Sequence, residues 1–410
     1  MRECLPLSAT TPTRRPIRTV LSGALAALLG AAVVGPSPAV AAPPTCGPTG
    51  GSAPVETPWA LRRLEPSAAW PLTRGTGITV AVIDSGVSAI HPLLKGQVLE
   101  GKDFNNLPAH QGQCDQAGHG TLVAGIIAGK EGTGAPFSGI APAARILPIR
   151  VLPSIKGTND EGLPGEIARA IDYAVDNGAD VINLSLVTEN RPQLATAVER
   201  ALAKRVVLVA AAGNRGESQQ DRTAYPAAYP GVIAVAGVDE QGGHVDSSVS
   251  GGYVDIAAPG LNIVGPAPAG PGYLAEPTGG TSFASAYVSG VVALVRAAHP
   301  DLTPQEIADR IERTADNPPE GHNAELGYGV VNPYRAVTSL LGTRTNPPAG
   351  LLPAPTGPDD PLSWQRTAAI WTAAIGGLLA ALLLAARPII MRGRRRGWRP
   401  GRRTDSPVAG

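Results

Sequence analysis

Four residues of this 410-residue sequence have the types and surroundings of a site that could activate a serine nucleophile. Ser282 comes at the start of a small-residue, apolar run in GTSFASAYVSGVVALV, and His119 lies between glycines in AGHGTLVAGIIAG. Asp84 lies near the end of the apolar run in GITVAVIDSGV. A serine hydroxyl is a weak nucleophile, so it needs a neighbouring base that a third group orients. Asn214, at the end of VVLVAAAGN, could donate its amide to an oxyanion, although an asparagine there could equally be a turn residue.

The segments around these residues predict where each would lie. Ser282 would begin a buried helix, where unpaired N–H groups favour an oxyanion, unless the serine is only the helix cap. Asp84 would follow a buried parallel strand, at the edge of the sheet where catalytic groups collect in open α/β folds. The alternation predicts an α/β fold with a doubly wound, mainly parallel sheet and helices on both faces. Strands are expected at 77–83, 145–151, 180–185, 206–211 and 231–237, and helices at 120–129, 163–177, 191–204, 283–298 and 303–315.

These four sequence blocks resemble the active-site blocks of the subtilisin-like serine proteases, the subtilases of peptidase family S8. The matching stretches, in the chain order of that family, are VAVIDSGV, GHGTLVAG, AAAGN and GTSFAS. The resemblance implies that Ser282 attacks the scissile carbonyl, while His119 takes the serine proton and later passes it to the leaving amine. It implies that Asp84 holds the imidazole, and that the Asn214 amide and the Ser282 N–H form the oxyanion hole.

The stretch INLSLVTEN resembles the subtilase strand that pairs with the substrate backbone and forms one wall of the primary specificity pocket. Many subtilases have glycines after the Ser-Leu pair, whereas this chain has Val187 and Thr188. Side chains there would narrow the pocket, so we expect a restricted specificity for polypeptide substrates. The residues that the resemblance places at this pocket are Ser185, Leu186, Val187, Ala211 and Gly213.

The ends of the sequence carry export and membrane signals. Arginines precede an apolar stretch and AVAA near the N-terminus, a pattern typical of a signal peptide, with general export favoured over the twin-arginine route. Residues 367–386 carry no charge and are long enough to span a bilayer. The predicted parts are a signal peptide (1–41), an N-terminal extension (42–75), a peptidase domain (76–341), a Pro-rich linker (342–363), a transmembrane helix (364–390) and a basic tail (391–410).

The arginine-rich tail predicts the topology. Positive charge beside a span stays in the cytoplasm, so the peptidase domain would be extracytoplasmic on a single-pass cell-membrane protein. With 34 basic and 33 acidic residues the whole chain is nearly neutral. We therefore interpret the basic cluster as an orienting and lipid-binding feature of the membrane helix and expect no nucleic-acid partner.

Two cysteines are expected in the mature chain. Cys4 lies in the predicted signal peptide, and in an oxidising exterior Cys46 and Cys114 would form a disulfide. No histidine has a partner at a recognisable metal-ligand spacing, so we expect no metal or other cofactor, with a structural calcium left open.

The arrangement of parts resembles the mycosins, the membrane-anchored subtilases of actinobacterial type VII secretion systems. Residues 42–83 leave no room for the inhibitory prodomain of many secreted subtilases, and a cysteine lies in QCDQAGHGT. The resemblance implies a membrane-anchored endopeptidase that acts beside a type VII secretion complex. A general cell-surface subtilase, or a mainly structural part of such a complex, are the alternatives.

Overall fold

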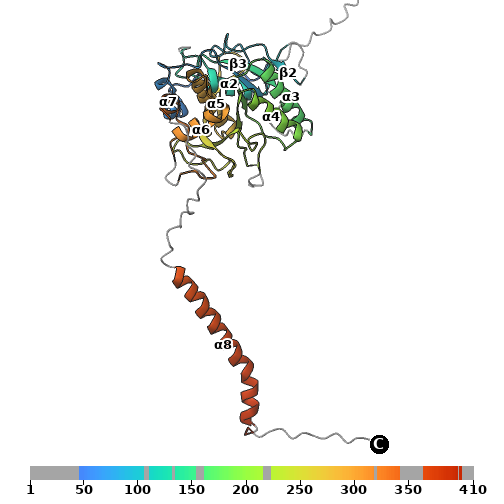
Figure 1. Cartoon of the computed structure of the whole chain (residues 1–410), viewed down its shortest axis with the longest axis vertical. Coiled ribbons are helices and arrows are strands. Elements are labelled where there is room, and N and C mark those ends of the chain that lie inside the picture. Colours follow the sequence, from blue (N-terminus) through green and yellow to red (C-terminus); the bar gives the residue numbers. More distant parts are fainter. Residues whose placement is uncertain are drawn as a thin grey trace, which may run out of the picture. The chain divides into compact units, whose positions relative to one another are not determined.

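The computed structural model describes residues 46–105, 110–131, 134–153, 161–215, 223–317, 321–341, 363–395 and 397–398 (Figure 1). The chain divides into two units, one that ends at Leu340 and one that begins at Leu341. The predicted signal peptide, most of the linker and most of the basic tail lie outside the described residues.

A seven-stranded sheet forms the centre of the first unit, with the strands in the order β2-β3-β1-β4-β5-β6-β7. Each neighbouring pair is parallel. The runs of Val, Ile and Ala that predicted strands are almost entirely buried, as expected of a parallel sheet covered on both faces. The bounds are β1 Thr79–Asp84, β2 Lys102–Asp103, β3 Arg145–Arg150, β4 Val181–Leu184, β5 Val207–Ala211, β6 Ile233–Val238 and β7 Ile256–Pro259.

Helices cover both faces of this sheet, which confirms the predicted fold class. Alternate residues of β1 point to opposite faces, so Val80 and Val82 belong to one core cluster and Ala81 and Ile83 to the other. The first cluster contains the helices α2 (His119–Ala128) and α5 (Thr281–Ala298), and the second contains α3 (Leu163–Asp176) and α4 (Pro192–Ala203).

Several elements around the sheet were not predicted. They are the strands β2 and β7, the antiparallel hairpin β8 (Ile263–Pro266) and β9 (Tyr273–Glu276), the helices α1 (Trp59–Leu64) and α7 (Pro333–Thr338), and the 3₁₀ helix Pro66–Ala68. All are short, and a six-residue helix or a four-residue strand carries too few repeats for a periodic pattern to stand out. By contrast, α6 (Pro304–Thr314) begins after Thr303, whose side chain forms a capping box with Glu306.

The N-terminal extension is part of the folded unit. Gly51 pairs with Tyr273 of β9 through two backbone hydrogen bonds, of 2.8 and 3.0 Å, and so adds a third segment to the hairpin. Helix α1 buries Leu61 and Leu64 in the core. The Trp59 indole donates a hydrogen bond of 3.0 Å to the carbonyl of Leu261. The extension is therefore held to the folded unit at Gly51 and along α1.

The second unit contains one long helix, α8 (Ser363–Arg395). An 18-residue window within Ala368–Arg395 has a mean hydropathy of 2.1 and contains no buried residue, so this stretch is a candidate membrane span. Helix α5 is also long and apolar enough to cross a membrane, but 83% of it is buried inside the first unit. The sheet thus accounts for the apolar character of α5, whereas nothing within the described chain covers α8.

Candidate active site

Asp84 and His119 meet at the carboxyl edge of the sheet. Asp84 is the last residue of β1 and His119 is the first of α2. Nδ1 of His119 lies 2.8 Å from Oδ1 and 3.0 Å from Oδ2 of Asp84. Gly120 permits this approach, because a Cβ at that position would come within 2.1 Å of the carbonyl oxygen of Gly86. The imidazole is therefore held through Nδ1, and Nε2 remains available.

A second buried carboxylate supports this pair. Asp115 accepts hydrogen bonds of 2.8 Å from the Ser85 hydroxyl and from the N–H groups of Gly118 and Thr121. Ser85 in turn donates its N–H to Oδ1 of Asp84, at 2.7 Å. Asp115 thus ties the residue after Asp84 to the first turn of α2, and sequence reasoning did not single it out.

Ser282 lies in the first turn of α5, the helix that fills the opposite side of the site. The helix begins at Thr281 after Gly280 and has no side-chain cap, so Ser282 does not serve as its cap. The Ser282 hydroxyl donates to the carbonyl of Ser185, at 3.1 Å. The next residue, Phe283, places its ring 5.3 Å from the imidazole of His119. A rotation about χ1 would turn the hydroxyl between staggered positions without moving the helix.

The Asn214 amide has a defined orientation. Its Oδ1 accepts a hydrogen bond of 3.0 Å from the N–H of Thr281 and one of 3.3 Å from the Thr281 hydroxyl. The same hydroxyl accepts from the N–H of Gly213, at 3.2 Å. Because the oxygen is bound, the amide nitrogen is the end left to donate, as an oxyanion requires. Thr281, which the sequence analysis did not select, sets this orientation.

Comparisons with known proteins give the family of this chain. The family model described as Peptidase_S8, the subtilase family, matches residues 75–329. The chain belongs to the subtilase family. Subtilases are serine endopeptidases, and that is the enzyme class of this chain.

Individual subtilases are similar over most of the chain. The thermophilic serine proteinase of Bacillus sp. (strain AK1) is 41% identical over 66% of this chain and 64% of its own length. Mycosin-4 of Mycobacterium tuberculosis (strain ATCC 25618 / H37Rv) is 34% identical over 81% of this chain and 80% of its own. A solved structure described as an intact ESX-5 inner membrane complex contains a similar chain, with 30% identity and a TM-score of 0.64. The match covers 86% of the present chain and 99% of the chain in that complex.

A buried polar network lies beneath Ser282 in this subtilase. Nδ2 of Asn183, on β4, donates to the hydroxyls of Ser289 (2.9 Å) and Ser285 (3.4 Å). The hydroxyls of Ser185 and Ser285 both lie within hydrogen-bond distance of the Ser282 carbonyl, at 2.7 and 2.8 Å. The network fixes the first turn of α5 on β4. The serines at 282, 285 and 289 share one face of an otherwise apolar helix, a signal that the sequence contains.

The residues expected at the specificity pocket lie at or just after the ends of the strands β4 and β5, and Ser185 among them contacts Ser282. Ser185 and Leu186 are buried directly after β4, and Ala211 is the buried last residue of β5. Val187 is 47% exposed, and its Cγ1 lies 3.6 Å from the position that a Cβ would take on Gly213. A valine methyl therefore faces the backbone of Gly213 across the expected pocket.

A disulfide joins Cys46 to Cys114, with the Cα atoms 5.0 Å apart. It attaches the extension to the residue just before Asp115, and so to the loop that supports the Asp84–His119 pair. Among the described residues, Cys46, His110 and Cys114 are the one group of side chains that could hold a metal ion, and the disulfide occupies both sulfur atoms.

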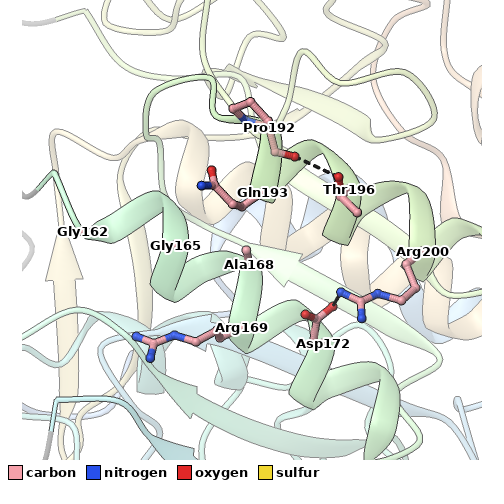
Figure 2. Close-up of a pocket in the computed structure, with 9 residues that line it drawn as sticks. All are labelled: Gly162, Gly165, Ala168, Arg169, Asp172, Pro192, Gln193, Thr196 and Arg200. Atoms are coloured by element: carbon pink, nitrogen blue, oxygen red, sulfur yellow. Dashed lines mark hydrogen bonds and ion pairs between the residues drawn. The ribbon is translucent and has the colours of Figure 1, made fainter.

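A cavity of about 680 Å³ lies away from these residues, between α3 and α4 on the other face of the sheet (Figure 2). Arg169 and the ion pair of Asp172 with Arg200 line it, together with small residues of both helices. It contains none of the residues expected to act in catalysis or to bind substrate.

Proposed function

We propose that the chain is a membrane-anchored, extracytoplasmic endopeptidase of the mycosin type, which cleaves a few exported polypeptides beside an ESX secretion complex. The observation that carries the chemical part is the Asp84–His119 pair, which lies with Ser282 and Asn214 at one edge of the sheet. The similarity to a chain of the ESX-5 inner membrane complex, which extends over 86% of this chain, supports the cellular part.

In the proposed mechanism the Ser282 hydroxyl leaves the Ser185 carbonyl and attacks the scissile carbonyl carbon, while Nε2 of His119 takes its proton. The Asn214 amide and the Ser282 N–H donate to the oxyanion that forms. When the C–N bond breaks, His119 returns the proton to the leaving amine. Water then attacks the acyl-enzyme by the same route. Asp84 stabilises the imidazolium in both half-reactions.

The charges around His119 predict the acid limit of activity. Burial lowers the pKa of His119, but the charge and hydrogen bond of Asp84 and the charges of Asp115 and Glu276 outweigh it, so the net shift is upward from 6.5. Only the neutral imidazole can take the serine proton, so activity is lost as the pH falls through this raised pKa. We expect the acid limb of kcat/KM above pH 6.5. A pH profile with its acid limb below that value would contradict the assignment.

Val187 supports the proposed restriction of specificity. Its side chain lies opposite Gly213, where a large substrate side chain would enter. Two peptides are compared, one with phenylalanine and one with alanine before the scissile bond. Val187→Gly is expected to raise the phenylalanine-to-alanine ratio of kcat/KM by roughly tenfold or more, because a pocket larger by a few methylene groups changes kcat/KM by about that factor. Both peptides are measured with both proteins. An unchanged phenylalanine-to-alanine ratio would show that Val187 does not close the pocket.

Helix α8 supports the proposed anchor, and its arginine-rich C-terminal end supports a cytoplasmic C-terminus. Deleting residues 364–410 is expected to move the protein from the membrane fraction to the soluble fraction with peptide hydrolysis unchanged. Ser282→Ala in the full chain is the matched control, because it should stay in the membrane. A truncated protein that still pellets with membranes would show that another segment holds it there.

The two alternatives predict different phenotypes for this pair of variants. If the protein is mainly a structural part of a secretion complex, Ser282→Ala leaves bulk export running while the deletion stops it. If it is a general cell-surface subtilase, both variants lose processing of exported proteins and neither blocks export. The endopeptidase that we propose loses processing of a few exported proteins in both cases, and a membrane complex co-purifies with the full chain in mild detergent.

A further inference from the structure

Glu276 is the last residue of β9 and lies two residues after Leu274, which contacts the residue before the catalytic histidine. Its charge acts on His119 together with those of Asp84 and Asp115. Those two aspartates are fully buried and hydrogen-bonded within the protein. Glu276 is only partly buried, and no ion pair or side-chain hydrogen bond to another described residue engages its carboxylate.

The hairpin that carries Glu276 forms one wall of the site. Leu274 and Pro48 both approach Gly118, the residue before His119, and would lie 2.8 and 3.2 Å from a Cβ on it. Beyond Glu276 the chain turns, with the N–H of Gly279 bound to the Glu276 carbonyl at 3.1 Å, and then enters α5 at the nucleophile. Glu276 therefore lies on the segment that connects the wall beside His119 to Ser282.

This wall lies on the leaving-group side of the scissile bond. The acyl half of a substrate would occupy the other side, where Ser185, Val187 and Gly213 follow β4 and β5. The catalytic histidine must face the departing amine, because it gives the amine its proton. The start of α2 packs against the hairpin, so the residues that follow the scissile bond would pass beside Glu276.

We propose that Glu276 selects a lysine or arginine within the first two residues after the scissile bond of a polypeptide substrate. This assignment rests on the proposed endopeptidase function and names a substrate feature for it. An unpaired carboxylate at the margin of a partly water-excluded cleft attracts a cation and repels an anion. At this degree of exposure, the expected preference for lysine over glutamate is about tenfold in kcat/KM.

The test compares Glu276→Gln, which keeps the shape and removes the charge, with the wild-type protein. Two sets of three peptides share one acyl half and have lysine, glutamine or glutamate at the first or at the second residue after the scissile bond. The wild-type protein is expected to prefer lysine over glutamate by about tenfold at low salt, and high salt should reduce this preference. In Glu276→Gln the lysine-to-glutamate ratio of kcat/KM is expected to approach one. Its acid limb should also move to lower pH, since Asp84 and Asp115 alone then act on His119.

The control variant is Glu240→Gln, which removes the same charge from an exposed position paired with Arg62. It should retain the wild-type ratio. An active wild-type protein whose lysine-to-glutamate ratio equals that of Glu276→Gln would overturn the assignment to Glu276 alone. A wild-type protein that cleaves none of the peptides would contradict the proposed endopeptidase function, and the assignment with it. If Glu276→Gln does not fold, a wild-type lysine preference that is insensitive to salt overturns the proposal.

Discussion

Replacing Ser282 with alanine is expected to lower kcat for peptide hydrolysis by about 10⁶-fold, the scale of loss known for the nucleophile of subtilisin itself. The hydroxyl makes a single hydrogen bond in the described structure, to the Ser185 carbonyl, and the network below uses the Ser282 carbonyl instead. The variant should therefore fold normally. Hydrolysis of a peptide by purified protein, with thermal unfolding measured in parallel, checks both parts.

Ser285→Ala is the matched control for this change. It removes a hydroxyl from the same turn of α5, and with it a hydrogen bond of 2.8 Å to the Ser282 carbonyl. The same hydroxyl lies 3.0 Å from that of Ser185 and accepts from Asn183 at 3.4 Å, and each buried hydrogen bond that is lost costs about 1–3 kcal/mol of stability, whereas the nucleophile remains. We expect a lower melting temperature with most of the activity retained. If Ser282→Ala hydrolysed the peptide at the wild-type rate, Ser282 would not be the nucleophile.

Asn214→Ala is expected to lower kcat by about 10²–10³-fold with little change in KM, which is the effect known for the corresponding donor of subtilisin. The reason lies in Thr281, whose N–H and hydroxyl bind Oδ1 and leave the amide nitrogen to donate. The oxyanion exists only after the attack, so the lost interaction belongs to the transition state and not to the bound substrate. Steady-state kinetics on a peptide separate the two parameters.

Thr281→Val tests this orientation independently. The valine keeps the shape of the side chain and the backbone N–H, but loses the hydroxyl that binds both Asn214 and Gly213. We expect a smaller fall in kcat than for Asn214→Ala, because one of the two bonds to Oδ1 remains. An Asn214→Ala variant that raised KM and left kcat unchanged would assign the amide to substrate binding instead.

The sequence was sufficient to predict the helices and strands that are long enough to show a periodic pattern of apolar residues. The buried strands β1, β3, β4, β5 and β6 and the helices α2 to α6 lie within about two residues of the predicted ranges. The fold class followed from their alternation. The hairpin β8–β9 could not be predicted in this way, because its pairing depends on contacts with the extension and with α2.

In the site, the residues expected to act in catalysis could be predicted from the sequence, whereas the residues that position them could not. Asp84, His119, Asn214 and Ser282 stood out because glycines and strand ends surround them. Thr281, Asp115 and Asn183 did not stand out, because their importance depends on partners such as Ser85 for Asp115, Asn214 for Thr281 and Ser289 for Asn183, which lie 30, 67 and 106 residues away in the chain. Only folding brings such pairs together. Supporting residues of this kind are found from distances between atoms, and a single sequence contains none.

Helix α5 has a consequence for the order in which the enzyme is made. It packs against β4, β5, β6 and β7, and its first turn carries Ser282. A chain that emerges from the ribosome, or from an export channel, with its N-terminus first presents all the strands before this helix. Until α5 arrives, the strands β4 to β7 have no cover on the face that α5 packs against, and the site lacks its proposed nucleophile. The domain therefore gains a large part of its core and its proposed nucleophile in the same step, so a molecule that still lacks α5 cannot cut the chain that is being delivered.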